Sequence, residues 1–139
     1  MTFIRLAAIA VIGLSLAAQT KQTYKARLSP VPADARTRAQ LAGTGSVTAT
    51  LEGSKLSLTG SFEGFLSPVT TAELHSGVAA GVRGALISEL TISKATDGTI
   101  TGSVDLTPPQ LTNLQHGGLY VEIHSEKSPD GVLWGWLLK

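Results

Sequence analysis

The sequence predicts an all-β fold, an antiparallel β-sandwich with Greek-key-like connections and one short helix. Apolar and hydroxyl-bearing residues alternate with a period of two along several segments, and glycine- or proline-containing turn signals separate those segments at short intervals. The length of 139 residues favours a single domain, since domains cluster around roughly 100–150 residues. Because the chain contains no cysteine, a disulfide scaffold and a thiolate metal site are both excluded.

The strand predictions start from a hairpin. Residues 46–51 and 56–62 alternate between apolar and polar side chains, and the turn at 52–55 joins them. A segment at 24–28 is expected to be an edge strand, because Pro30 follows it and has no N–H to donate. The remaining strands are expected at residues 69–75, 84–92, 99–106, 119–124 and 132–138.

One short helix is predicted after the strand at 99–106. Thr107 and Gln110 stand three residues apart, as in a capping box, and Pro108 occupies the first helical position, where its missing N–H costs nothing. Gly117 or Gly118 is expected to end the helix.

The first 18 residues differ in composition from the rest. Arg5 precedes the uncharged apolar run 6–18, which ends in small residues. This layout is typical of a secretory signal peptide, whose apolar region spans about 7–15 residues, whereas a membrane-spanning helix needs about 20. We therefore expect residues 1–18 to be a signal peptide or an uncleaved anchor that reaches the membrane surface, and residues 19–139 to form a periplasmic or extracellular domain.

The charge balance argues against nucleic acid as a partner. Eleven basic and ten acidic residues give a net charge of +1, without the surplus of Lys and Arg that neutralising phosphates requires.

Two Glu-x-His units are the candidate metal ligands. Residues two apart on a strand share a face, so Glu73 and His75 project together, as do Glu122 and His124. If the two strands are neighbours, these side chains converge as a set suited to zinc or copper. The alternative is a hydrogen-bonded polar cluster without a metal, and no cofactor is otherwise expected. Ser76 and Ser125 adjoin the histidines but point to the opposite face, so no catalytic triad is indicated and we expect no enzyme activity.

Several motifs together resemble the CHRD domain, the module repeated in chordin and found singly in exported bacterial proteins. The resemblance covers about residues 22–138, and the motifs that carry it are Ala72-Glu-Leu-His-Ser-Gly77, Gly81-Val-Arg-Gly84, 111–118, Tyr120-Val-Glu-Ile-His-Ser125, Pro129-Asp-Gly131 and Gly131-Val-Leu-Trp-Gly-Trp-Leu137. It implies a β-sandwich in an extracytoplasmic location that acts through protein binding, without enzymatic activity.

The chain departs from the family pattern at informative positions. Glu73 replaces the first family histidine, Ser125 replaces a threonine, and the closing strand is apolar where relatives are polar. If that strand keeps the family register, the outward row includes both tryptophans of the chain and consists of Val132, Trp134, Trp136 and Leu138. Exposed tryptophans are typical of binding hot spots, although both faces of the strand could instead be covered within the domain.

Three functions follow from these features. The leading hypothesis is a structural subunit that docks through its tryptophan strand onto a larger membrane-associated complex at the periplasmic face, for which an energy-converting complex is a natural host. The second is a periplasmic copper- or zinc-binding or redox-handling protein that uses the four Glu and His residues. The third is a free-standing extracellular adhesion or matrix module.

Overall fold

The computed structural model describes residues 20–139, so the predicted signal peptide or anchor at 1–18 lies outside the described range. Within that range, no helix combines the length and apolar character needed to cross a membrane.

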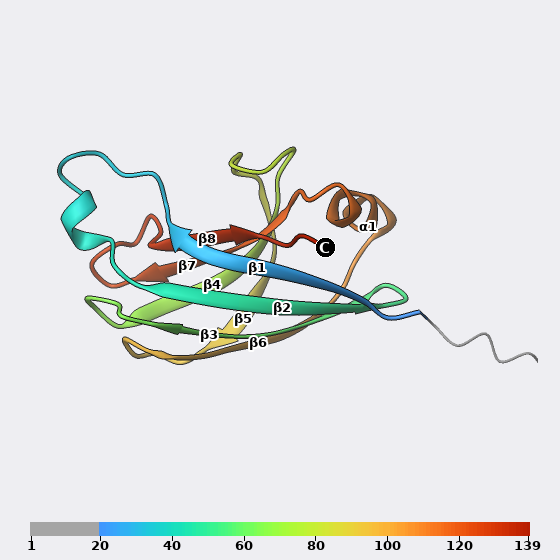
Figure 1. The fold of residues 1–139 in the computed structure, drawn as a ribbon, viewed down its shortest axis with the longest axis horizontal. Coiled ribbons are helices and arrows are strands. Elements are labelled where there is room, and N and C mark those ends of the chain that lie inside the picture. The colour runs from blue at the N-terminus through green and yellow to red at the C-terminus, as the bar shows by residue number, and fades with distance from the viewer. Residues whose placement is uncertain (1–19) are drawn as a thin grey trace, which may run out of the picture.

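Residues 20–139 form eight strands, a 3-10 turn (η1) and a single α-helix (α1), shown in Figure 1. The elements are β1 (Gln22–Pro30), η1 (Arg38–Gln40), β2 (Thr44–Glu52), β3 (Lys55–Glu63), β4 (Val69–Ser76), β5 (Ala85–Ile92), β6 (Gly98–Asp105), α1 (Pro108–Gln115), β7 (Leu119–Ser125) and β8 (Leu133–Trp136). The predicted strand segments are therefore confirmed, with ends that differ by a few residues.

The strands close into a barrel in the order β1-β2-β3-β6-β5-β4-β7-β8, so the predicted sandwich is wrong. The barrel closes because β1 pairs on both sides, with β2 along most of its length and with β8 at Ser29 and Pro30. A bridge from Lys25 to Leu138 extends the contact with β8. The predicted edge strand is consequently not an edge: Pro30 ends the ladder, but the residues before it are paired.

The barrel interior holds the core. Alternate residues of most strands point inward and are buried, as in β1, where Tyr24, Ala26 and Leu28 are almost inaccessible to water. Tyr24 from β1 and Phe62 from β3 join aliphatic side chains from the facing strands. Burial of this apolar surface is the main favourable term in folding, and it fixes which residues remain on the outside.

The predicted capping box of α1 is present. The Thr107 side-chain oxygen accepts from the Gln110 N–H at 3.4 Å, and the Gln110 side-chain oxygen accepts from the Thr107 N–H at 2.9 Å. Asn113 on this helix donates to Ser76 and Gly77 at the end of β4. Figure 1 shows α1 beside the C-terminus, with η1 and the β7–β8 loop at the other end of the barrel.

Gly135 permits the closing contact between β8 and β1. A Cβ atom at this position would lie 2.4 Å from the carbonyl oxygen of Arg27 and 2.9 Å from Leu28 Cδ2. Backbone cannot yield to such an overlap as a flexible side chain can, so the strands could not approach as closely.

We therefore expect Gly135→Ala to destabilise the protein by about 1–3 kcal/mol or more, the usual cost of overpacking a core. Urea unfolding followed by circular dichroism measures the change, with Ser57→Ala on the exposed face of β3 as the control. An unchanged unfolding midpoint in Gly135→Ala would contradict the role of this glycine in closure.

Candidate functional site

The candidate site lies on the outer face of three adjacent strands, β4, β7 and β8. Glu73 of β4 is the register partner of Glu122 of β7, and Glu122 is in turn the partner of Trp134 of β8. In the next outward-facing row, His75, Tyr120 and Trp136 are partners in the same way. The strands that carry the two Glu-x-His units are therefore neighbours, as the predicted cluster requires.

The four predicted ligand residues do lie together. His75 Nε2 is 2.8 Å from Glu73 Oε2, and the same oxygen is 3.4 Å from His124 Nε2. His124 Nε2 is also 3.2 Å from Glu122 Oε1. Within residues 20–139 no three or more His, Asp or Glu side chains form a preassembled metal site, and metal binding by these residues stays a prediction.

Both imidazole rings are held by backbone carbonyls through Nδ1. His75 Nδ1 lies 3.1 Å from the carbonyl oxygen of Gly84, and His124 Nδ1 lies 2.8 Å from that of Pro129. A carbonyl oxygen can only accept a hydrogen bond, so each Nδ1 must carry a hydrogen and donate. The rings are thereby oriented with Nε2 toward the carboxylates of Glu73 and Glu122.

Sequence reasoning missed Arg83, which reaches the cluster from the loop between β4 and β5. Its Nη1 donates to both carboxylate oxygens of Glu122, at 2.7 and 2.5 Å, and Nη2 donates to the Asp130 carbonyl at 3.4 Å. The guanidinium also lies 5.1 Å from the centre of the Trp134 ring. The signal in the sequence is a lone charged residue inside the glycine-rich stretch 77–84.

That loop is fastened at both ends. The Gly77 N–H donates to the Gly118 carbonyl at 2.8 Å, and the Gly84 N–H donates to the Tyr120 hydroxyl at 2.9 Å. At Gly84 a Cβ atom would lie 1.9 Å from the Ser76 carbonyl oxygen, so this close approach requires glycine. The loop consequently covers Tyr120, which is buried although it points outward.

The buried charge at the centre of the cluster is Glu122, with only 2% of its side chain exposed. Burial alone would raise its pKa, but the contacts with His124 and Arg83 outweigh that effect and lower the pKa. The pKa of His124 is raised, chiefly by its contact with the Glu122 carboxylate, against the opposing effect of burial. The two pKa shifts favour a protonated His124 beside an ionised Glu122.

The aromatic side chains of the same face pack against one another. The rings of Trp134 and Trp136 meet edge to face with centroids 4.7 Å apart, and Trp136 lies 5.0 Å from Tyr120. Tyr120 stacks on His75 with a centroid distance of 5.0 Å and an interplanar angle of 10°. The two tryptophans are half-buried as a result, and Trp136 Nε1 is buried without a hydrogen-bond partner.

Of the predicted outward row, Leu138 is 51% exposed, whereas Val132 is buried. The prediction that Val132 faces outward is wrong. Ile123 is the register partner of Leu133, yet its carbonyl also accepts from the Val132 N–H at 2.7 Å. Val132 precedes β8, and its carbonyl accepts from the Val31 N–H at 3.0 Å, so this residue is enclosed between β7 and the end of β1.

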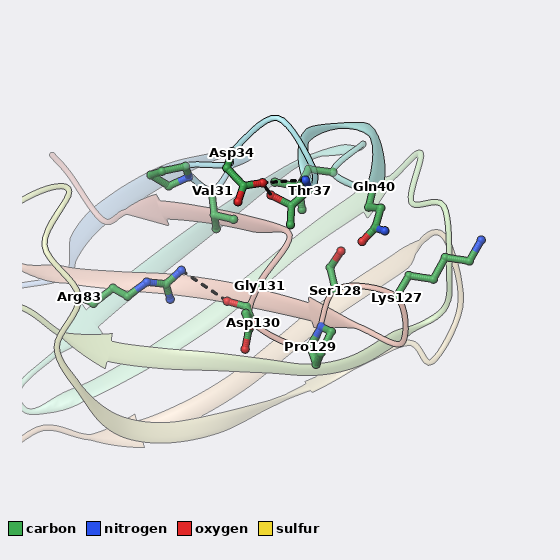
Figure 2. Close-up of a pocket in the computed structure, with 12 residues that line it drawn as sticks. Val31, Asp34, Thr37, Gln40, Arg83, Lys127, Ser128, Pro129, Asp130 and Gly131 are labelled. Carbon is green, nitrogen blue, oxygen red and sulfur yellow. Dashed lines mark hydrogen bonds between the residues drawn. The ribbon is translucent and has the colours of Figure 1, made fainter.

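A groove of about 350 Å³ opens beside the cluster at the end of the barrel (Figure 2). It lies between the segment that follows β1 and the β7–β8 loop, and Arg83 stands at its border with its bond to Asp130. Asp34 faces the groove, but its carboxylate accepts from the N–H groups of Arg36 and Thr37, which lower its pKa. This acid therefore stabilises its own loop.

We expect Arg83→Gln to destabilise the protein by about 1–3 kcal/mol, because Glu122 would keep its burial and lose its charged donor. The double variant Arg83→Gln/Glu122→Gln should recover part of the loss, since the buried charge is then removed. A double-mutant cycle from urea unfolding measures the coupling, and strictly additive losses would contradict a direct interaction.

The raised pKa of His124 predicts a pH dependence of stability. A ring whose folded-state pKa exceeds its ordinary value of 6.5 stabilises the fold fully below pH 6.5, and the contribution is lost as the pH rises through the folded pKa. Glu122 has the opposite sign: its contribution is present above its ordinary pKa of 4.5 and is lost as the pH falls through its lowered folded pKa.

In His124→Gln the loss of stability above pH 6.5 should therefore be reduced, whereas His116→Gln at the exposed end of α1 should behave as wild type. Urea unfolding at a series of pH values, with a chelator present, measures both. The same decline in wild type and His124→Gln would contradict the assignment.

One of the comparisons with known proteins identifies the family of this chain. The family model described as the CHRD domain matches residues 24–137, nearly the whole chain, and so spans β2 to β8, most of β1 and every residue of the cluster. A search of curated proteins finds no match. On the strength of the family match, the chain belongs to the CHRD domain family.

Proposed function

We propose that this chain is a small, non-catalytic module of the periplasm or extracellular space that docks onto a membrane-associated protein complex. Membership of the CHRD family supports an exported binding module. The docking partner is inferred from the outer face of β8. The proposal rests on one observation: a strip formed by Trp134, Trp136 and Leu138 lies beside basic residues of β1.

The composition of this strip suits a protein partner. Aromatic residues and arginine are enriched at the centres of protein interfaces, where burying a tryptophan contributes strongly to affinity. Leu138 is half-exposed, and the two tryptophans keep part of their rings accessible.

Charge beside the strip indicates the chemistry of the partner surface. Lys25 lies opposite Leu138, and the exposed side chain of Arg27 follows two residues later on the outer face of β1. Lys139 ends the chain with its ammonium group 5.7 Å from the centre of the Tyr24 ring. We therefore infer a partner surface that is apolar at its centre and bordered by carboxylates, which would also orient the approach.

The docking prediction is tested by replacing both tryptophans. Trp134→Thr/Trp136→Thr should lose most of the protein that co-purifies with detergent-solubilised membrane complexes from the native host, because the apolar contact area is removed. Leu66→Thr is the matched control, since Leu66 is 52% exposed and lies in the loop between β3 and β4, outside the strip.

Circular dichroism and thermal unfolding first establish that the variants remain folded. Undiminished co-purification of a folded double variant would contradict docking through β8.

Intact mass spectrometry of the native protein tests the alternative of a free-standing adhesion or matrix module. A soluble monomer without a partner would favour that alternative.

A further inference from the structure

The Nε2 atoms of His75 and His124 face carboxylate oxygens, so each needs a proton or a metal ion between it and the oxygen. Because His75 and His124 both donate through Nδ1 to backbone carbonyls, their Nε2 atoms face carboxylate oxygens. A neutral ring would direct the Nε2 lone pair at those oxygens, which is repulsive. Each Nε2 must therefore hold either a proton or another cation.

The two rings differ in how well a proton suits them. His75 Nε2 makes a hydrogen bond to Glu73 Oε2 at 2.8 Å. His124 Nε2 is buried and lies near two carboxylate oxygens, at 3.2 and 3.4 Å, but it has no hydrogen-bond partner of acceptable geometry. A buried polar atom without a well-formed hydrogen bond is rare in folded proteins and needs an explanation, of which a bound ion is one.

The donor separations are close to those around a single metal ion. Divalent copper prefers square-planar or tetragonal coordination, in which adjacent donors bound at about 2.0 Å lie about 2.8 Å from each other. Glu73 Oε2 is 2.8 Å from His75 Nε2 and 3.4 Å from His124 Nε2, so the second contact would have to shorten. Among residues 20–139 no group of three or more such side chains is already placed to hold an ion, so binding here requires the side chains to move.

The net charge of the surrounding side chains is also compatible with a divalent cation. With both rings neutral, the carboxylates of Glu73 and Glu122 and the guanidinium of Arg83 sum to one negative charge. Two Nε2 protons change the sum to one positive charge, and a divalent ion in their place gives the same total. Glu122 is bonded by Arg83 through both oxygens and is therefore left out of the ligand set.

We propose that His75 and His124, through Nε2, and Glu73, through a carboxylate oxygen, bind one Cu²⁺ ion in place of the two Nε2 protons. Two imidazoles and a carboxylate suit divalent copper, which binds such nitrogen and oxygen donors more tightly than Zn²⁺ does. The backbone carbonyls on Nδ1 supply the outer hydrogen bonds that metal-bound histidines usually make. This site goes beyond the docking function and does not depend on it.

Copper binding is tested on the untagged, metal-free protein by titration with CuSO₄ against a competing chelator. Wild type should bind one equivalent, and its electron paramagnetic resonance spectrum should show coupling to two imidazole nitrogens. His75→Gln and His124→Gln should each weaken binding by about 100-fold or more, since loss of an outer-shell partner alone costs 10–100-fold. The matched control is His116→Gln, which removes the chain's third histidine at the exposed end of α1.

Each outcome decides for or against the site. A spectrum with fewer than two coupled nitrogens, equal binding by wild type and His75→Gln/His124→Gln, or loss of binding in His116→Gln would overturn the proposal. The spectrum of wild type decides the question even if a histidine variant fails to fold. Co-purification of the tryptophan variants is a separate measurement, so failure of the copper site would leave the docking function standing.

Discussion

Closure of the barrel between β1 and β8 is the constraint on which the rest of the structure depends. An open sheet would leave β8 as an edge strand with unpaired backbone groups, whereas closure pairs it on both sides. Closure also determines which side chains face the barrel interior and which lie on its outer surface. Because Leu133 and Leu137 fill the interior, the alternation of the strand places Trp134 and Trp136 on the outer surface.

The outer face is organised around Glu122, a carboxylate buried against β4 and β8. Burying a charge without partners is costly, so its neighbours must supply hydrogen bonds and opposite charge. Arg83 does so from a position 39 residues away in the sequence and joins the β4–β5 loop to the β7–β8 loop through Asp130. His124 contributes from the same strand, and its ring is held by the Pro129 carbonyl of that second loop.

The sequence pattern was sufficient for the strands but not for their closure. Alternation shows which residues face inward, and the capping box of Thr107 and Gln110 specifies the start of α1. It does not show which strand ends meet, because a sandwich and a barrel bury the same alternating residues. The close approach at Gly135, which distinguishes the two, is a contact between positions about a hundred residues apart.

The candidate site, like the fold, could be predicted from the sequence only in part. Residues two apart on a strand share a face, so the two Glu-x-His units could be recognised without knowing the fold. The burial of Val132 could not be foreseen, because it depends on backbone hydrogen bonds with Ile123 of β7 and with Val31. Arg83 was equally hidden: a loop has no periodicity, and only its folded path places the guanidinium over Trp134 and against Glu122.

The strip of Trp134, Trp136 and Leu138 and the His/Glu cluster are connected through Tyr120 and Arg83, and these contacts join the two proposals physically. His75 stacks on Tyr120, which in turn packs against Trp136, and Arg83 contacts both Trp134 and Glu122. A partner that covers the tryptophans would exclude water near Arg83 and strengthen its attraction to Glu122. An ion bound by His75 would hold the ring that stacks on Tyr120, and Tyr120 packs against Trp136. Since coupling between two binding events is reciprocal, this aromatic contact is the route through which docking and ion binding would influence each other.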